Sequence, residues 1–187
     1  MLEISIAQYQ KYWYSIYNKD NLEKIMNIFN QHRIICALNK GIFGTTIINN
    51  LIELKMQECN MIKTTILNKN LSYIGKPIIL TKNQKSLGLF NGDTGIMLPD
   101  KDNILKAFFV LKNKAIKIIP INLIQEYKTA WSMTIHKSQG SEFNHVTIIL
   151  PNETSSIITR ELIYTGITRS KKKITIFSLQ KKLFKSY

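Results

Sequence analysis

Apolar residues near the start of the chain recur with the period of an α-helix. Four of them fall at i, i+3, i+4 and i+7 and predict a helix with one apolar face: Leu22, Ile25, Met26 and Phe29. Asp20 followed by Glu23 resembles a capping box and predicts where this helix begins. The apolar run 33–38 predicts a buried strand, and residues 46–58 predict a second helix.

From residue 73 the helical period gives way to short runs of strand-forming residues. Four runs are predicted strands: 77–81, 95–98, 104–111 and 115–119. Asn91-Gly92 predicts a hairpin turn because both residues tolerate positive φ, and Lys112-Asn113-Lys114 predicts a second tight connection. Short strands with turn signals over residues 73–128 therefore predict a small β-barrel.

After residue 128 the chain returns to strands that alternate with a helix. The predicted strands are 130–135, 146–150 and 174–178, and the helix opens near Thr159. This helix is expected to turn Leu162, Ile163 and Ile167 toward the sheet. The alternation predicts an α/β fold with a parallel sheet covered by helices on both faces. Residues 1–72 and 129–187 would then form one domain, interrupted by a β insert at 73–128.

The charge of the chain points to a polyanionic partner. The formal net charge is +14, and three of the 26 cations are arginine, which leaves 23 lysines. Such a balance favours nucleic acid over a membrane surface, although a lysine-rich composition by itself is an equally open explanation. No apolar run approaches the roughly 20 residues of a membrane span, and no secretory signal is recognised. We expect a cytoplasmic protein.

The cysteines and histidines predict no metal site. Cys36 and Cys59 do not have zinc-ligand spacing, and the three histidines do not cluster. Cys36 lies in an apolar run and is expected to be a small buried residue. His145 and Trp131 are expected to be structural. Residues 171–173, three lysines, are expected to form a solvated face, with attraction to DNA as the alternative.

Residues 134–143, Thr-Ile-His-Lys-Ser-Gln-Gly-Ser-Glu-Phe, form a polar stretch between two apolar runs. The layout predicts strand, loop and strand, and in an open α/β sheet such loops emerge at the carboxyl ends of strands, where ligands bind. The stretch resembles motif V of superfamily 1 helicases. Residues 164–169, Tyr-Thr-Gly-Ile-Thr-Arg, resemble motif VI of the same enzymes. The pair is most similar to the RecD family, the alpha subunit of exodeoxyribonuclease V (RecBCD).

The resemblance covers roughly residues 22–178 and implies the second RecA-like domain of such a helicase, with an SH3-like insert matched by residues 88–95. It implies DNA contacts for four residues of motif V: Thr134, His136, Lys137 and Ser138. It implies nucleotide contacts for Gly140, Glu142 and Arg169. Of these, Arg169 is the catalytic residue, since the family's motif VI arginine reaches the γ-phosphate held by the other RecA-like domain. Lys137 is as well explained by solvation.

The first half of an ATP site is missing from the sequence. The phosphate loop G-x-x-x-x-G-K-[ST] does not occur, and no aspartate is directly followed by glutamate. Phosphoryl transfer needs a phosphate cradle and a magnesium ligand. ATP and Mg²⁺ of the complete enzyme would therefore require an N-terminal RecA-like domain, and the chain alone is predicted inactive. Asn39 also stands where the family's motif IV usually has a basic residue.

Five aromatic residues gather in the first 19 positions: Tyr9, Tyr12, Trp13, Tyr14 and Tyr17. They could form a stacking platform for bases. The packed side of an amphipathic helix is the favoured interpretation.

Two functions remain for the whole chain. The first is half of the motor of a 5′-to-3′ DNA helicase subunit that acts on single-stranded DNA with RecB-like and RecC-like subunits in double-strand break repair. The second is a non-catalytic DNA-binding or subunit-assembly module, the remnant of such a protein.

Overall fold

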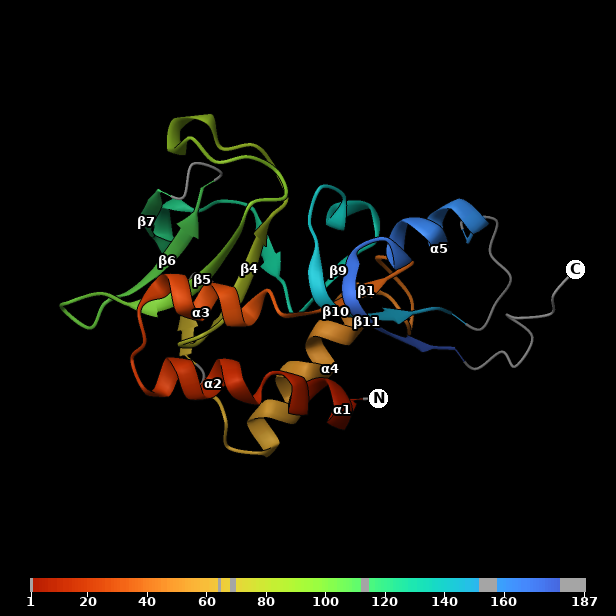
Figure 1. The fold of residues 1–187 in the computed structure, drawn as a ribbon. Coiled ribbons are helices and arrows are strands. Elements are labelled where there is room, and N and C mark those ends of the chain that lie inside the picture. Colours follow the sequence, from red (N-terminus) through yellow and green to blue (C-terminus); the bar gives the residue numbers. More distant parts are fainter. Residues whose placement is uncertain (1, 64, 68–69, 112–114, 152–157, 179–187) are drawn as a thin grey trace, which may run out of the picture. The chain divides into compact units, whose positions relative to one another are not determined.

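The structure, a computed structural model, describes residues 2–63, 65–67, 70–111, 115–151 and 158–178 (Figure 1). The helices are α1 (Leu2–Gln8), α2 (Gln10–Tyr17), α3 (Leu22–Phe29), α4 (Thr45–Glu58) and α5 (Arg160–Ile167). The chain divides into two compact units. The first unit comprises Met1–Tyr9, Phe29–Leu51 and Ser132–Tyr187, and the second comprises Gln10–Ile28 and Ile52–Trp131.

The first unit is built on a four-stranded parallel sheet. Its strands are β1 (His32–Cys36), β9 (Ser132–Thr134), β10 (Phe143–Ile149) and β11 (Ser170–Phe177), in the order β11-β10-β1-β9. Every ladder in this sheet is parallel, and β1 is buried along its whole length. These ladders confirm the predicted parallel sheet. It could be predicted because a central strand that is covered on both faces forms a continuous apolar run in the sequence.

Helices lie on the two sides of this sheet. Figure 1 shows α5 on one side and α1 and α4 on the other. Thr159 caps α5 as predicted, since its hydroxyl oxygen accepts the N–H of Leu162 at 3.2 Å. Gly166 of α5 comes close to the sheet: a Cβ there would lie 3.3 Å from methyl groups of Ile35, Ile135 and Ile148.

The start of α3 differs from the prediction by one residue. The side chain of Asn21, and not that of Asp20, accepts the N–H of Lys24 at 2.9 Å. The Asp20 carboxylate instead accepts the Ser15 hydroxyl at 2.8 Å and pairs with Lys24 Nζ at 2.9 Å. The capping box was therefore wrong because a neighbouring asparagine takes the cap and leaves the aspartate to join α2 to α3.

The N-terminal aromatic residues separate into packed and exposed sets. Tyr9 and Tyr12 are buried, which confirms the packing interpretation for these two. The rings of Trp13 and Trp131 lie 5.7 Å apart. Tyr14 and Tyr17 remain exposed on α2.

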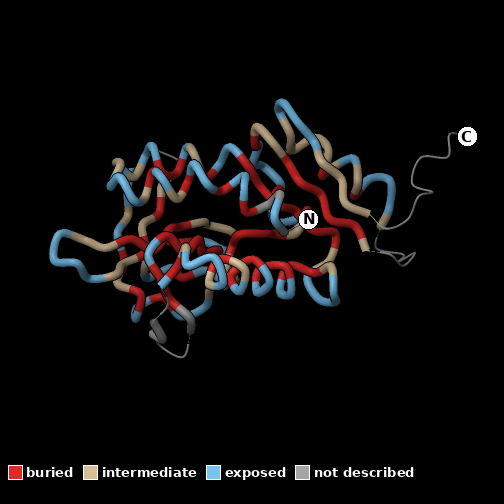
Figure 2. The backbone as a smooth tube through the Cα atoms, turned by 90° about the horizontal axis from the view of Figure 1, so that it is seen from below, coloured by how far each residue is buried: buried red, intermediate tan, exposed pale blue. Residues whose placement is uncertain are grey.

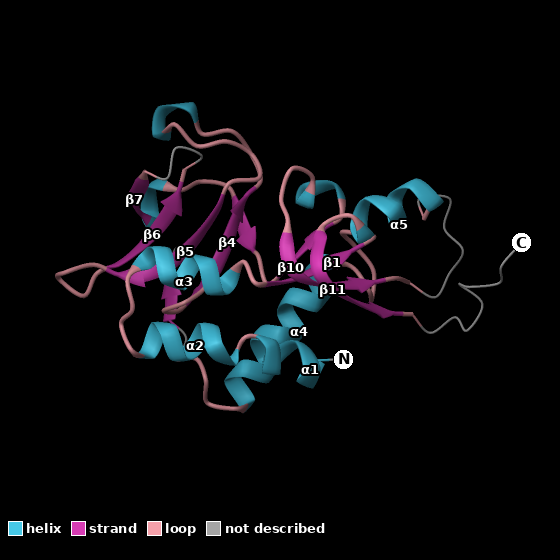
Figure 3. Ribbon diagram, in the orientation of Figure 1, coloured by secondary structure: helices cyan, strands magenta, loops and turns pink. Residues whose placement is uncertain are grey.

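The second unit contains a five-stranded antiparallel sheet, drawn in magenta in Figure 3. Its strands are β4 (Pro77–Leu80), β5 (Thr94–Pro99), β6 (Leu105–Val110), β7 (Ile116–Pro120) and β8 (Tyr127–Thr129), in the order β7-β6-β5-β4-β8. The four predicted strands are confirmed, while β8 was not predicted. A separate hairpin pairs β2 (Thr65–Leu67) with β3 (Asn70–Ser72).

The inner face of this sheet has an apolar core of its own. It comprises Ile78, Leu80, Leu89, Met97, Ala107, Phe109, Ile119, Ile121 and Ile124. Within the described strands β7 and β8 are the two edges, so the structure shows an antiparallel sheet and not a closed barrel. Figure 2 shows buried backbone running through the strands, whereas the helices alternate between buried and exposed positions.

The predicted turns have different outcomes. Gly92 adopts a positive φ of +96°, but β4 and β5 are joined by the long segment 81–93, which includes a 3-10 turn at Lys85–Leu87. A two-residue hairpin at Asn91-Gly92 was therefore wrong. The second predicted connection, residues 112–114, lies outside the described residues.

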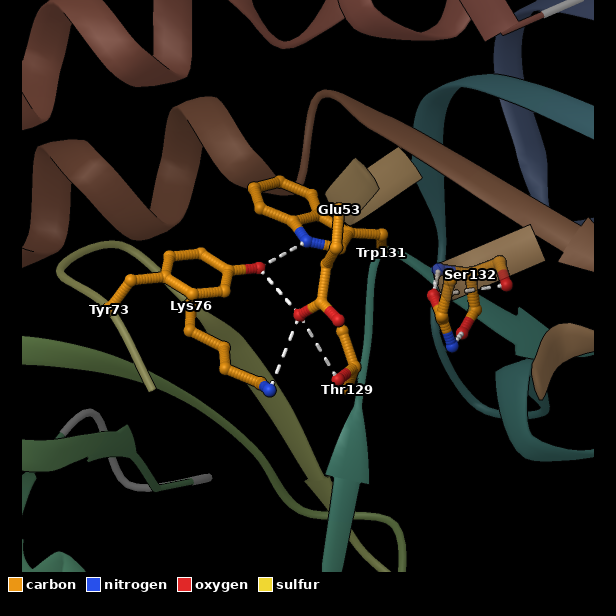
Figure 4. A network of polar contacts seen from close by, with 7 residues as sticks. Glu53, Tyr73, Lys76, Thr129, Trp131 and Ser132 are labelled. Atoms are coloured by element: carbon orange, nitrogen blue, oxygen red, sulfur yellow. Dashed lines mark hydrogen bonds and ion pairs between the residues drawn. The ribbon is translucent and has the colours of Figure 1, made fainter. Parts of the chain in front are cut away.

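A buried polar network lies within the second unit (Figure 4). One carboxylate oxygen of Glu53, on α4, accepts the hydroxyls of Tyr73 at 2.8 Å and Thr129 at 3.3 Å, and it lies 3.3 Å from Lys76 Nζ. The Tyr73 hydroxyl in turn accepts the indole N–H of Trp131 at 2.8 Å. Burial, reinforced by the Glu53 carboxylate, raises the pKa of Tyr73 well above its usual range. The phenol therefore remains a neutral donor, as a partner of a carboxylate must.

The compact units are not divided at the predicted domain boundaries. Residues 73–128 fall within the second unit, but so do α2, most of α3 and the later part of α4. The β segment therefore packs as a unit with preceding helices, which a linear reading of the sequence does not reveal.

Candidate functional site

The polar loop after β9 begins with a short turn. Residues His136–Ser138 form a 3-10 turn, and the Thr134 hydroxyl oxygen accepts the N–H of Lys137 at 3.3 Å. The N–H of Ile135 donates to the Cys36 carbonyl at 3.0 Å, which continues the pairing with β1. His136 and Lys137 are exposed and Thr134 is half-buried. These three side chains lie on one short segment that a ligand can reach.

The side chain of Ser138, in contrast, cannot be reached by a ligand. Its side chain is fully buried, and its hydroxyl donates to the Ile135 carbonyl at 2.6 Å. The Ser138 carbonyl accepts the N–H of Ser141 at 3.0 Å. In this conformation the hydroxyl that was expected to contact DNA instead stabilises the turn.

Gly140 lies in a conformation that favours glycine. Its φ is +79°, and a Cβ built there would meet no atom within 4 Å. The main chain is exposed at this point. A phosphate or ribose can therefore approach the backbone closely.

The Glu142 carboxylate pairs with a lysine near the start of β11. Its carboxylate lies 3.0 Å from Lys171 Nζ, and both side chains are more than half exposed. Exposed ion pairs contribute roughly 0–1 kcal/mol, so this contact orients the carboxylate without fixing it. A ligand hydroxyl can replace the lysine at little cost.

Arg169 is oriented by carbonyl and hydroxyl oxygens. Its Nε donates to the Thr165 carbonyl at 3.1 Å, Nη1 to the Ser141 carbonyl at 3.3 Å, and Nη2 to the Thr168 hydroxyl at 3.1 Å. Among the described residues, no carboxylate lies within ion-pair distance of it. The guanidinium therefore keeps its full charge available to an anion, because neutral acceptors position it without neutralising it.

The main chain links Arg169 to the polar loop as well. The Arg169 carbonyl accepts the N–H of Phe143 at 2.9 Å, and Phe143 pairs with Ser170 in the β10–β11 ladder. The ladder, the Arg169 side chain and the Lys171–Glu142 pair together join residues 141–143 to residues 169–171. The three predicted nucleotide contacts thus belong to one corner of the first unit.

The predicted contacts separate between two ends of the sheet. Thr134 ends β9 and pairs with Cys36, the last residue of β1, so it lies at the carboxyl ends of the strands. Phe143 and Ser170 begin β10 and β11, so Gly140, Glu142 and Arg169 lie toward the amino ends. The loop thus emerges at the carboxyl end of β9, as expected, and its later residues reach the amino ends because a parallel crossover must return the chain to the opposite end of the sheet.

Asn39 has a structural role in the loop before α4. Its side-chain oxygen accepts the Thr45 hydroxyl at 2.8 Å, and its carbonyl accepts the N–H of Thr46 at 3.3 Å. The neutral side chain of Asn39 thus stabilises the turn from which α4 begins. A lysine or arginine could not accept that bond.

The residues expected to be structural are structural. Trp131 is fully buried, and His145 Nε2 lies 2.9 Å from the Thr175 hydroxyl. Burial raises the pKa of the Cys36 thiol to about 12, so this thiol is neutral and unreactive. The three lysines at 171–173 are exposed, which both a solvated face and an attraction to DNA require.

Sequence reasoning missed the residues that hold the site. Lys171, Ser141, Thr165 and Thr168 orient Glu142 and Arg169. Thr165 and Thr168 fall inside the second motif and could have been singled out there. Lys171 and the Ser141 carbonyl could not, because their role depends on how β10 and β11 pair.

Two kinds of feature are absent from the described residues. Within the described residues no group of three or more histidine, cysteine, aspartate or glutamate side chains could hold a metal ion. None of the described helices combines the length and the apolar character needed to cross a membrane.

Comparison with known proteins identifies related sequences. Residues 129–177 match the family of UvrD-like helicase C-terminal domains. The whole chain is 42% identical to the RecBCD enzyme subunit RecD of Buchnera aphidicola subsp. Schizaphis graminum, of which it covers 31%. Over 85% of its length it is 37% identical to the same subunit of Haemophilus influenzae, of which it covers 23%. The chain thus spans less than a third of the length of these relatives.

A solved structure supports the fold. A Bacteroides Pif1 helicase bound to single-stranded DNA superposes with a TM-score of 0.51 over 94% of this chain and 50% of that one, at 15% identity. At that identity the likeness concerns the fold alone. It supports a RecA-like helicase C-terminal fold with a parallel sheet.

Proposed function

We propose that the chain is a RecD-like helicase C-terminal portion and that it forms the second half of a motor that moves 5′ to 3′ on DNA. In the complete enzyme its first unit would close over ATP bound by a preceding RecA-like domain. RecB-like and RecC-like subunits and cytoplasmic double-strand break repair follow from the same proposal. The sequence matches support this function over a binding-only remnant.

The arrangement of Arg169 carries the proposal. A guanidinium that neutral oxygens orient, with no carboxylate paired to it among the described residues, suits the charge that develops on a transferring phosphoryl group. We assign Arg169 as the catalytic arginine that contacts the γ-phosphate. Gly140 would bring backbone close to the nucleotide, and Glu142 would accept from the ribose hydroxyls.

The DNA contacts belong to the opposite end of the sheet. We assign Thr134, His136 and Lys137 to the phosphate backbone of single-stranded DNA, since hydroxyl, imidazole and ammonium groups can all donate to phosphate oxygens. The Thr134 hydroxyl oxygen already accepts from Lys137 and keeps its own proton to donate. Ser138 is left out of this set because its hydroxyl is buried and donates to Ile135.

ATP binding needs groups that this sequence does not contain. The triphosphate cradle and the magnesium ligand would come from the preceding RecA-like domain, and ATP would supply the free energy for movement. The residues here fit the second half of that site, because they offer an oriented cation and open backbone. We further propose that the antiparallel sheet of the second unit corresponds to the SH3-like insert of RecD-like proteins.

The test joins the missing part to this chain. The region of the Buchnera relative that precedes the matched segment would be fused to residues 1–187, and DNA-stimulated ATP turnover would be measured. The fusion should hydrolyse ATP and the chain alone should not. Arg169→Lys should lower turnover at least a hundredfold, since an arginine finger contributes roughly 10³–10⁵ in rate.

Two controls make the result specific. Arg160→Lys changes the arginine at the start of α5 and should leave turnover within about twofold. DNA binding should persist in Arg169→Lys, which would separate a catalytic loss from a folding defect. Near-normal turnover of Arg169→Lys, or ATP hydrolysis by the isolated chain, would contradict the proposal.

A further inference from the structure

Helix α2 exposes two tyrosines on its outer face. Tyr14 is 68% exposed and Tyr17 is 86% exposed. Residues three apart on a helix are neighbours on its surface, with Cβ atoms about 5–6 Å apart. The two phenol rings thus form one aromatic patch that lies in water.

The inner face of the same helix is fixed. The Tyr12 hydroxyl donates to the Gly75 carbonyl at 2.7 Å, and the edge of the Tyr12 ring meets Trp131 with 5.7 Å between ring centroids. A Cβ at Gly75 would lie 2.7 Å from side-chain atoms of both Trp13 and Ile16, so this side of α2 packs without a gap. The helix therefore presents its outer tyrosines from a rigid base, all within the second unit.

Lysines lie on both sides of the aromatic patch. Lys11 is exposed and lies one turn before Tyr14, and Lys19 is exposed just after the helix ends. Asp20, the nearest acidic residue along the chain, has its carboxylate engaged by Lys24 and by the Ser15 hydroxyl. Along this segment the charge that flanks the two rings is therefore positive.

We propose that this face of α2 is a binding site for single-stranded nucleic acid. Two successive bases would stack on Tyr14 and Tyr17, and the phosphates beside them would contact Lys11 and Lys19. Aromatic side chains interleaved with cations are the usual means of holding single strands without sequence preference, because every base has a π-face. The proposal rests on the second unit alone and does not depend on the helicase function assigned to the first.

A protein partner fits this surface less well. In a protein interface the two flanking lysines would lie at the polar rim, where charges contribute little to affinity. A polyanion gains from each of them through the release of counterions.

The experiment compares two oligonucleotides on the intact chain. A fluorescently labelled thymidine oligomer and an abasic oligomer of equal length would be titrated with protein, and anisotropy would be recorded at two salt concentrations. The wild type should bind the thymidine oligomer more tightly. Tyr14→Ala/Tyr17→Ala should lose at least tenfold on this oligomer and change little on the abasic one, because only base stacking is removed.

Two further variants separate rings from charges. Tyr14→Phe/Tyr17→Phe keeps the rings and should bind like the wild type. Lys11→Gln/Lys19→Gln should weaken both oligomers alike and lower the slope of log affinity against log salt by about 1.4, which is two phosphate contacts at roughly 0.7 each. All four residues are exposed, so melting temperatures should not change.

The outcomes distinguish this site from the proposed helicase contacts. Thr134→Ala/His136→Ala should weaken both oligomers equally, since those contacts are to phosphate. If only that variant has an effect, or if wild-type affinity is the same for both oligomers, the site on α2 is overturned while the first unit keeps its assignment. If only the tyrosine variant has an effect, the DNA contacts assigned to the first unit fail instead.

Discussion

His32 is a buried titratable group at the start of β1. Its ring lies 4.8 Å from the ring of His145 and 5.2 Å from that of Tyr9, and its Nε2 is 2.9 Å from the Thr147 hydroxyl. Among the described residues its Nδ1 has no hydrogen-bond partner. Burial, the neighbouring His145 and the cation of Arg33 lower its pKa from 6.5 to about 3.

This residue should make stability depend on pH in a defined direction. The folded chain holds His32 neutral, while the unfolded chain takes up a proton below about pH 6.5. The contribution of His32 to the free energy of unfolding should therefore be fully present above about pH 6.5. It should fall as the pH is lowered toward 3, by up to about 1.4 kcal/mol per pH unit. His145 adds to the same trend, because burial and Lys173 lower its pKa.

Urea unfolding at a series of pH values would check this expectation. His32→Gln removes the titrating group and keeps a polar side chain near Thr147, so its stability should fall less steeply below pH 6.5. Identical slopes in the variant and the wild type would show that His32 is not the residue responsible.

For single residues, the sequence predicted which ones belong to the candidate site better than it predicted the contacts of their side chains. Arg169, Glu142 and Gly140 were singled out by motif resemblance, and the structure brings them to one corner. The buried hydroxyl of Ser138 could not be foreseen, because its acceptor depends on how the turn after β9 folds. Side-chain partners come from backbone geometry, and a linear motif does not contain that information.

Helix α4 shows two ion pairs in contrasting environments. Lys76 and Glu53 lie 3.3 Å apart with side chains only 5% and 9% exposed, whereas Lys55 and Glu58 lie 3.0 Å apart on the surface. Burial lowers the pKa of Lys76, and the Glu53 carboxylate opposes this change. The Glu53 carboxylate thus offsets part of what burial costs the Lys76 ammonium.

Removing the buried carboxylate should destabilise the chain far more than removing the exposed one. Glu53→Gln leaves a buried ammonium without its counter-charge, which costs on the order of 3–5 kcal/mol. Glu58→Gln is the matched control on the same helix and should cost less than about 1 kcal/mol. Free energies of unfolding from urea titration would compare the two.

A double variant tests whether the loss of the counter-charge causes the destabilisation. Glu53→Leu combined with Lys76→Met replaces both charges with apolar groups and should recover much of the lost stability. Equal losses for Glu53→Gln and Glu58→Gln would show that the network in Figure 4 contributes no more than a surface pair.

Elements were predictable where a period or a cap was strong. Helix α4 was expected at 46–58 and spans Thr45–Glu58, and β1 was expected at 33–38 and spans His32–Cys36. Strand β8 was missed because it has three residues and pairs with β4, whose sequence lies about fifty residues earlier. Such pairing is decided by tertiary contacts, which local patterns do not encode.

At the scale of the whole molecule, the parallel sheet and the antiparallel sheet pair their strands independently. Strands of the first unit pair only with one another, and so do those of the five-stranded sheet in the second unit. The sequence indicated this alternation of sheet types through the change of period near residue 73. It did not indicate that α2, most of α3 and the later part of α4 belong to the second unit, because the sequence of a helix does not specify the sheet against which it packs.

The parallel sheet should therefore fold without the antiparallel one. Replacing residues 75–127 with a short glycine-serine linker should leave a folded α/β unit, because all four strands of the parallel sheet and their ladders remain. Circular dichroism should keep a cooperative transition, with a smaller urea m-value since less surface becomes exposed on unfolding. Met97→Asp, which places a charge in the apolar core of the second unit, should disrupt that core in the unshortened chain while the cooperative transition of the first unit persists. If the shortened chain shows no cooperative transition, the β segment is integral to the folding of the parallel sheet, and the two units cannot fold separately.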